Sequence, residues 1–380
     1  MNLLRCVFNT LPRRGASLPF LGVLILALAA AACESIYDDQ SDCFGGIKLR
    51  FVYDYHMEPG ANAFPANVDC INVYVFDNEG NFVTQLAETS DLLRDEHYRM
   101  DLSLLDPGSY NIVVYGGLAC ANSAFRFSPQ WGTSAAAGYG QSDMTVTLPL
   151  DANGVSAKQL HNIESRTGGL FYGALKLTLT DEDFRKKGYR EETVYLVKDT
   201  NNIQIILQEL DDPYVIDVND YDFQIVDDNF VIDAENRVRE IASDDLRPCY
   251  KPYFSENRQT GFVDIDRLGN GDRVEENAAQ PVQVACVEFS TSRLVIEHLA
   301  TARLVVTHRE SGSKVIDIPL IEYLCLIRGM GDSWIKSDQE FLDRQSRWNM
   351  MLFLRNGKWS TTSVVIVVNA WVVRLNNVIF

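Results

Sequence analysis

The chain has 380 residues, of which 46% are hydrophobic, so it can form one or more packed domains and is not a wholly disordered chain. It carries 52 acidic residues against 34 lysines and arginines, a formal net charge of −18. A surface this acidic repels nucleic acid and anionic headgroups, so we expect no nucleic-acid partner.

The pattern of residues 1–32 predicts an export leader that is removed from the mature protein. Arg5, Arg13 and Arg14 precede an apolar run that begins at Leu18 and ends in alanines. The run is shorter than the roughly 20 apolar residues of a membrane-spanning helix, and no stop-transfer pattern follows it. We therefore expect export without a transmembrane helix.

The end of the leader resembles a bacterial lipobox. Ala30, Ala31 and Ala32 stand directly before Cys33, with Ala30 in place of the usual leucine. Cleavage before Cys33 leaves its thiol to carry diacylglycerol, and several acyl chains such as palmitate hold a protein firmly to a bilayer. The acidic stretch at 33–45 is then a lipidated tether. The alternative is an ordinary Cys33 beside a cleaved secretory signal.

Six further cysteines follow, and an exported chain can pair them in 15 ways that sequence alone does not distinguish. No two have CxxC spacing, so neither a zinc site nor a thioredoxin-like site is expected. We expect buried thiols among those that lie inside apolar runs, such as Cys286 and Cys325. The six are Cys43, Cys70, Cys120, Cys249, Cys286 and Cys325.

The first half predicts a β-sandwich at 46–165. Its apolar residues alternate with polar ones in short segments that are rich in aromatic and β-branched residues, which is typical of half-buried strands. Turn residues separate them, as in Asp77–Asn81 and Asp106–Gly108, and this spacing favours an antiparallel sandwich. The segments are 47–55, 71–76, 82–86, 98–104, 110–115 and 144–148.

The second half, 166–380, continues the same pattern after a polar boundary at 160–169, so the fold class is all-β with two domains. We expect a turn at Asp199–Asn202 and a polar excursion without strands at 255–280. One short helix near the C-terminus is predicted from the capping box that begins at Ser337. The chain ends in an apolar strand that begins at Trp371.

No catalytic motif is present, and we predict no enzyme activity, no cofactor and no metal. The acidic stretch from Asp264 to Glu275 follows an EF-hand loop in part, but Leu268 occupies a position that needs an oxygen ligand. A solvated acidic loop is the simpler interpretation. Acidic pairs such as Asp211–Asp212 are most simply turn residues. None of the five histidines lies in an HExxH metalloprotease motif, and no GxSxG or P-loop motif is present. The histidines are His56, His97, His161, His298 and His308.

Four aromatic residues lie in a loop at 121–143 that lacks periodicity. Such side chains can form a surface patch that binds a glycan or a partner protein. The candidates are Phe125, Phe127, Trp131 and Tyr139.

Taken in order, several segments resemble the FimB-like family of fimbrial anchor and minor-component lipoproteins, which includes Mfa-type minor fimbria anchors of Gram-negative anaerobes. No single segment is specific, and it is their order that carries the resemblance. They are the lipobox at Cys33, GIKLRFVYDY, VDCINVYVFDNEGNFV, YRMDLSLLDPGSYNIVVYGGL and SDQEFLDRQSRWNMMLFL.

The resemblance implies two tandem transthyretin-like β-sandwiches and a surface-exposed place at the outer membrane, where the protein attaches the fimbrial shaft to the cell and limits its length. Its partners would be the major fimbrial subunit and other accessory subunits, joined by strand addition. The C-terminal segment either closes its own domain or is donated. The alternative function is a surface lipoprotein adhesin or glycan-binding protein. The candidate strand-exchange residues are Trp371, Val373, Leu375 and Phe380.

Overall fold

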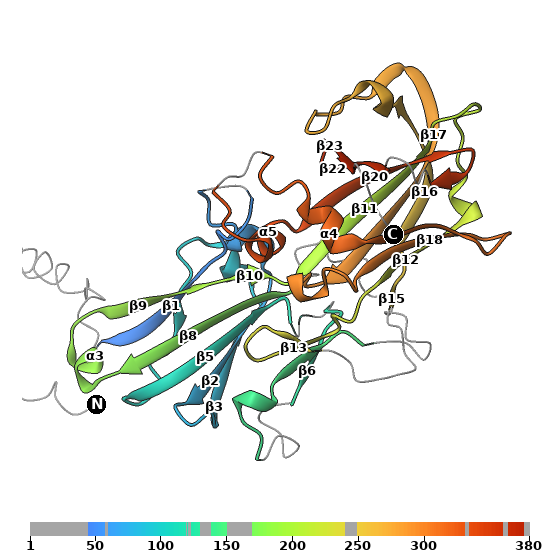
Figure 1. Cartoon of the computed structure of the whole chain (residues 1–380). Coiled ribbons are helices and arrows are strands. Elements are labelled where there is room, and N and C mark those ends of the chain that lie inside the picture. Colours follow the sequence, from blue (N-terminus) through green and yellow to red (C-terminus); the bar gives the residue numbers. More distant parts are fainter. Residues whose placement is uncertain are drawn as a thin grey trace, which may run out of the picture.

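The computed structural model describes residues 45–57, 60–118, 120, 123–129, 138–149, 169–239, 249–330, 334–359 and 364–375. It is an all-β protein in which two sandwiches follow one another along a long molecule, with short helices at their margins (Figure 1). The predicted fold class is confirmed.

Two sheets make the first sandwich. The three-stranded sheet has the order β4 (Met100–Asp101), β1 (Gly46–Val52), β9 (Tyr189–Tyr195), with β1 and β9 parallel. The five-stranded sheet is antiparallel, in the order β10 (Val197–Lys198), β8 (Phe171–Leu179), β5 (Gly108–Gly116), β2 (Ile71–Asp77), β3 (Phe82–Glu88).

A hydrophobic core fills the space between these two sheets. Leu49 and Phe51 of β1 point into it and pack with Val73 and Val114 of the facing sheet. All four are nearly or fully buried, as the alternation of β1 predicts. In β2, six consecutive residues are buried because both faces of that strand are covered.

The first sandwich extends past the boundary expected at residue 166. β8 pairs with β5 from Gly108↔Leu179 to Gly116↔Phe171, and β9 pairs with β1. Strand pairing therefore assigns β8, β9 and β10 to the first sandwich, and the second one begins after Lys198.

The second sandwich is also built from two sheets. The large one has the order β16 (Phe254–Phe262), β17 (Asn277–Ser292), β11 (Thr200–Glu209), β20 (Arg347–Arg355), β22 (Val364–Val368), β23 (Trp371–Leu375), and β21 (Lys358–Trp359) also pairs with β20. The small one has the order β15 (Cys249–Tyr250), β12 (Tyr221–Val226), β18 (Arg303–His308), β19 (Lys314–Pro319).

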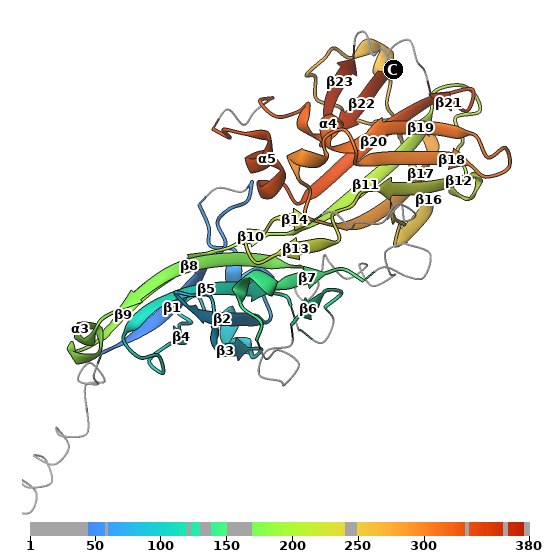
Figure 2. The ribbon, with the colours of Figure 1, turned by 60° about the horizontal axis from the view of Figure 1, so that its bottom comes forward.

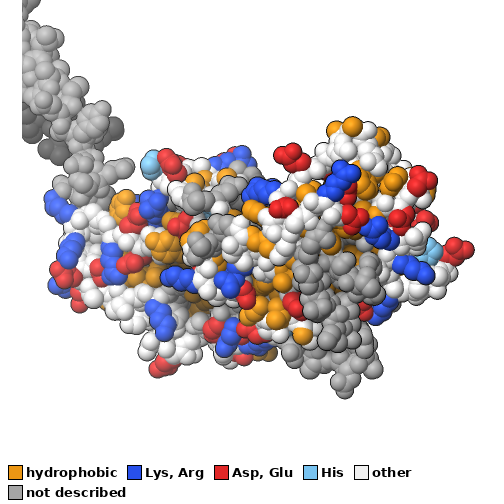
Figure 3. Space-filling view, turned by 45° about the horizontal axis from the view of Figure 1, so that its top comes forward, with side chains coloured by type: hydrophobic (Ala, Val, Ile, Leu, Met, Phe, Trp, Pro, Cys, Tyr) orange, Lys and Arg blue, Asp and Glu red, His pale blue; other side chains and the backbone are white. Residues whose placement is uncertain are grey.

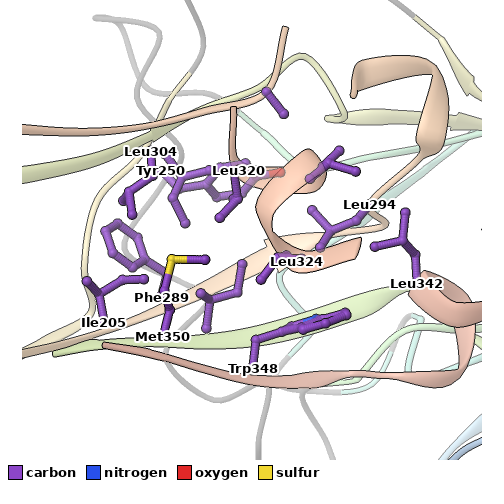
Figure 4. Packing of buried hydrophobic residues seen from close by; sticks show 14 of the residues in the cluster. Ile205, Tyr250, Phe289, Leu294, Leu304, Leu320, Leu324, Leu342, Trp348 and Met350 are labelled. Carbon is purple, nitrogen blue, oxygen red and sulfur yellow. The ribbon is translucent and has the colours of Figure 1, made fainter. Parts of the chain in front are cut away.

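The largest core lies between these sheets and under two helices (Figure 4). Trp348 and Met350 of β20 pack there with Phe289 of β17, while Leu304 of β18 closes the core from the other sheet. The Trp348 side chain is 1% exposed, as expected for a core residue, and its Nε1–H donates to Asn201 Oδ1 at 3.1 Å. The polar edge of the indole is thus satisfied inside the core.

A small sheet joins the two halves of the chain. Its strands have the order β14 (Val238–Arg239), β13 (Val231–Asp233), β7 (Thr145–Thr147), β6 (Arg126–Ser128), so it takes two strands from each half. Figure 2 shows it beside the five-stranded sheet, near the junction of the sandwiches. The outer face of that sheet contributes Tyr74 and Tyr115 to the same core cluster as Ile232. The two sandwiches therefore share a continuous apolar core.

Short helices complete the described part of the chain. The helix and its N-cap are confirmed, since Ser337 Oγ accepts from the Glu340 N–H at 3.1 Å where α5 begins. The reciprocal bond of a capping box is not made, because the Glu340 carboxylate accepts from the Lys336 N–H instead. The second helix near the C-terminus, α4, was not expected, because a short apolar run has the same pattern in a buried strand. The helices are α2 (Phe64–Asn67), η2 (Asp91–Arg94), η4 (Gln141–Asp143), α3 (Asp181–Arg185), η6 (Val218–Asp220), η7 (Ile265–Arg267), η8 (Ile296–His298), α4 (Leu320–Cys325) and α5 (Asp338–Arg344).

Candidate functional site

The C-terminal strand β23 is an edge strand of the large sheet. It pairs antiparallel with β22, from Val364↔Leu375 to Val368↔Trp371. Asn369 and Ala370, both with positive φ, make the tight turn between the two strands. Of the candidate residues, Val373 is 3% exposed and Trp371 is half-buried against the core, while Phe380 lies outside the described residues. In this structure the segment closes its own sheet.

The other edge of β23 is covered by a loop at 269–274. The Gly271 N–H donates to Val372 O at 2.8 Å, and the Val372 N–H donates to Asp272 O at 2.9 Å. The guanidinium of Arg273 lies over the Trp371 ring, 4.5 Å from its centre. A covered edge does not recruit other strands, so the loop protects the open side of the sheet at this point.

This covering loop belongs to the acidic stretch that partly resembles an EF-hand. Asp264 accepts from the Asp266 N–H at 3.2 Å, and Asp272 accepts from the Gly269 N–H, so these two carboxylates support local turns. Leu268 packs against a small apolar cluster on the outer face of the large sheet, which explains an apolar residue at that position. Within the described residues no group of three or more potential ligands is placed to hold a metal ion.

The three loop aromatics that the structure describes do not form one surface patch. Phe125 is 6% exposed and belongs to the core, which contradicts its prediction as a surface residue. Phe127 is partly buried and stacks on Tyr74, with the ring centres 4.5 Å apart. Tyr139 is exposed, and Trp131 lies outside the described residues. The small sheet explains the difference, because β6 turns this part of the loop toward the core.

A buried polar cluster lies where the chain passes from the first sandwich to the second. Asp199 is fully buried, and it accepts from Asn236 Nδ2 at 3.0 Å. Arg293 forms a bidentate pair with Asp343 of α5 at 2.9 Å and lies 3.7 Å from Asp199. Asp199 Oδ2 has no hydrogen-bond partner. Burial raises the pKa of Asp199 from 3.8 to about 7, although Arg293 and Asn236 favour the charged form.

The sequence predicts a turn at Asp199–Asn202, and the structure instead buries all four residues. Asp199 N–H donates to Leu170 O at 2.8 Å, and β11 starts at the next residue. A run of four polar residues is typical of an exposed turn, so local sequence gives no indication that this one is buried.

Two of the cysteines, Cys70 and Cys120, form a disulfide within the first sandwich. Cys286 is fully buried, and burial raises the pKa of its thiol to about 11, which makes it unreactive near neutral pH. Cys325 is partly buried on α4, and burial raises its pKa to about 12. Cys33, the predicted lipid site, lies outside the described residues, as do Cys43 and His161.

The described histidines do not gather into one site. His298 is buried with its Nδ1 2.6 Å from Asp227 Oδ1, and His308 contacts Ser311 at the end of β18. His56 and His97 belong to the first sandwich, near different backbone segments. In the described portion, no helix has the length and apolar character needed to span a membrane.

Two stacked sandwiches joined by a shared core define a modular all-β protein. The sequence belongs to the family of fimbrillin-A associated anchor proteins Mfa1 and Mfa2, whose model matches residues 40–377. The expected family is therefore confirmed. No curated protein matches the sequence significantly.

Solved structures agree with this assignment. A proposed adhesin from Bacteroides thetaiotaomicron is 35% identical, with a TM-score of 0.71, and the match covers 88% of this chain and 99% of that chain. A proposed polysaccharide-binding protein from the same organism is 28% identical, with a TM-score of 0.66 and the same coverage. The fimbrial anchor protein Mfa2 from Porphyromonas gingivalis is 16% identical over 87% of this chain and 99% of that one, with a TM-score of 0.60, and shares the fold.

Proposed function

We propose that this chain is a non-enzymatic fimbrial accessory subunit that is lipidated on Cys33, attaches the fimbrial shaft to the outer membrane and limits its length. The observation that carries the proposal is that the first described residue and the C-terminal strand lie at opposite ends of the molecule. The chain enters the described fold at Gly45, packed against the backbone of α3, at the end of the first sandwich. β23 lies at the opposite end, in the second sandwich (Figure 2). A protein with this layout spans from a membrane tether to a distal polymer.

The first strand supports an anchoring role. β1 is paired on both sides, by β4 and by β9, and its Ile47 and Leu49 are fully buried. The first sandwich is therefore complete with its own strand and has no vacant place there for a strand from another subunit. A subunit that accepts no further strand ends growth of the polymer at its own position.

Contact with the shaft is assigned to strand addition by the segment Trp371–Phe380. Strand addition uses backbone hydrogen bonds for affinity and side-chain pockets for specificity. β23 is the last strand in the described part of the chain, and there it has a full strand partner on one side only. Its withdrawal breaks the pairing with β22 and the contacts of the covering loop, and equivalent pairing with the neighbouring subunit must replace them.

A disulfide lock tests this assignment. Because the N–H and C=O of Val372 face the covering loop, Val367↔Val372 is a non-hydrogen-bonded pair, in which cross-strand Cβ atoms lie close together. We expect the double variant V367C/V372C to fold, reach the cell surface and release fimbriae into the medium. Each single variant serves as a control and should retain them. If the locked variant keeps its fimbriae, the C-terminal segment is not exchanged.

A second candidate function is a surface adhesin or glycan-binding protein. It is favoured by the similarity to the Bacteroides thetaiotaomicron proteins described as an adhesin and as a polysaccharide-binding protein, which are 35% and 28% identical. The burial of Phe125 removes part of the aromatic patch that first suggested it. Beads that carry the purified protein should then adhere to mucin or to host cells, and absence of adhesion rejects this function.

A further inference from the structure

Three adjoining hollows lie around residues 54–57 and 60–63, where the first sandwich meets α5 of the second. Their volumes are about 670, 340 and 330 Å³. The largest and the smallest share Arg50 and Asn62, and the smallest shares His56 and Arg344 with the third, so the hollows form one continuous cleft. These volumes fall in the range of small-molecule binding sites, which often lie between domains.

The cleft is basic in a chain that is acidic overall. Its lining includes six lysines and arginines but only two acids, Asp54 and Glu96. The whole chain has the opposite bias, with 34 basic and 52 acidic residues. On the face shown in Figure 3, acidic and basic side chains are intermixed. Three of these residues, Arg94, Arg99 and Arg344, are already paired with acids outside the lining, so they do not add to the free positive charge of the cleft. The six are Arg50, Arg94, Arg99, Lys198, Arg344 and Arg347.

Arg50 lines two of the three hollows. It leaves β1 between the inward-pointing Leu49 and Phe51, so it lies on the outer face of the sheet. No hydrogen bond or ion pair to the side chain of Arg50 is found within the described residues, and its Nε is inaccessible to solvent and without a partner. By contrast, Arg99 already donates to Glu191 and Arg94 to Asp91. A buried donor without a partner is unfavourable, and an anionic ligand that bonds the remaining N–H groups of the Arg50 guanidinium would pair its charge.

At the other end of the cleft, Arg344 and Trp334 form a cation and aromatic platform. The guanidinium of Arg344 lies between two rings, 3.8 Å from the centre of Tyr55 and 4.9 Å from that of Trp334. Its Nε donates to Glu340 Oε1 at 2.9 Å. Trp334 remains 45% exposed and offers a flat apolar face.

From these features we infer that the cleft binds an acidic oligosaccharide. Arginine guanidinium groups match carboxylates in charge-assisted hydrogen bonds, which suits Arg50 to a sugar acid. An exposed indole suits the apolar face of a sugar ring. The three hollows together have the volume for more than one sugar residue, with one acid group at Arg50 and the ring platform at Trp334. This site is separate from the lipid tether and from the C-terminal strand.

Isothermal titration calorimetry of the mature lipoprotein in detergent tests the inference. The probe is a short oligogalacturonate, and an uncharged oligosaccharide of equal length is the comparison. We expect saturable binding of the uronate that weakens as salt rises, and no binding of the neutral chain. Arg50→Gln should weaken binding at least tenfold, since a charge-assisted hydrogen bond is lost. Trp334→Ala, at an exposed position, should weaken it several-fold.

Arg258→Gln is the matched control, because Arg258 lies on β16 of the second sandwich and pairs with Glu256. It should bind as the unaltered protein does. Equal binding of the neutral oligosaccharide, equal losses in the Arg50 and Arg258 variants, or no uronate binding would overturn the inference. Full competition by inorganic phosphate, or preference for phosphate over uronate, would overturn the assignment to a sugar. Equal thermal melting of the variants verifies that each is folded.

Discussion

The buried Asp199 gives the most direct test of the junction between the sandwiches. The pKa of its carboxyl is raised from the ordinary value of 3.8 to about 7 in the folded protein, because burial disfavours the charged form more than Arg293 and Asn236 favour it. The folded state therefore holds a proton that the unfolded state has lost. Stability falls as pH rises between these two values, and the fall approaches about 4 kcal/mol at pH 8.

Asp199→Asn removes this titration and keeps an oxygen that can accept from Asn236. We expect the variant to be about as stable as the parent near pH 4 and more stable by a few kcal/mol at pH 8. Urea unfolding at pH 4, 5, 6, 7 and 8, followed by tryptophan fluorescence, measures the difference. Because all other groups titrate in both proteins, the difference between the two curves isolates Asp199. Asp91→Asn, at an exposed position of η2, is the control and should follow the parent. Parallel curves for the Asp199 variant and the parent would refute the reasoning.

Three further changes test the packing. Replacing both Cys70 and Cys120 by alanine opens a disulfide with a sequence separation of 50 and should lower the free energy of unfolding by about 4 kcal/mol, whereas an unchanged melting temperature would argue against that bond. Gly173→Ala should destabilise by about 2 kcal/mol, since the new Cβ would lie 2.7 Å from Val194, and a neutral effect would mean that β8 and β9 are not in this contact. Trp348→Ala should lower the free energy of chemical unfolding by about 3–5 kcal/mol, and a loss below about 1 kcal/mol would contradict its place in the core.

Local patterns in the sequence identify most strands but not their partners. The alternation in Phe171–Leu179 predicts a strand, yet its pairing with β5 is set across about 60 residues of chain, and no turn marks it. The segment therefore looks like the start of the second domain, although it completes the first. Pairing between distant segments depends on the whole fold.

Polar strands and buried polar residues are the other elements that local sequence does not reveal. β16, Phe254–Phe262, was expected to be a polar excursion, but it pairs with β17 over most of its length. It is polar because an edge strand outside the core has both faces largely exposed, and charged edges discourage aggregation. Asp199 is the opposite case, a polar residue that is buried. Local sequence does not reveal this, because its charged neighbour Arg293 is distant in the sequence.

The site predictions also differ in how far local sequence could reveal them. Val373 lies in the C-terminal strand as expected, because its apolar alternation continues the sheet. Phe125 was expected at the surface, because a segment rich in Ala, Ser and Gly has no apolar period. The cleft around Arg50 gathers side chains from both sandwiches, and only the folded chain brings them together.

The attachment of Cys33 to lipid is the central claim, and phase partition in Triton X-114 measures it most directly. The mature protein should enter the detergent phase, sediment with outer membranes and incorporate labelled palmitate. Cys33→Ser should move it to the aqueous phase without label, and fimbriae should appear in the medium. A parent protein that stays in the aqueous phase, or a Cys33→Ser variant that still holds its fimbriae at the cell, would contradict an anchoring role.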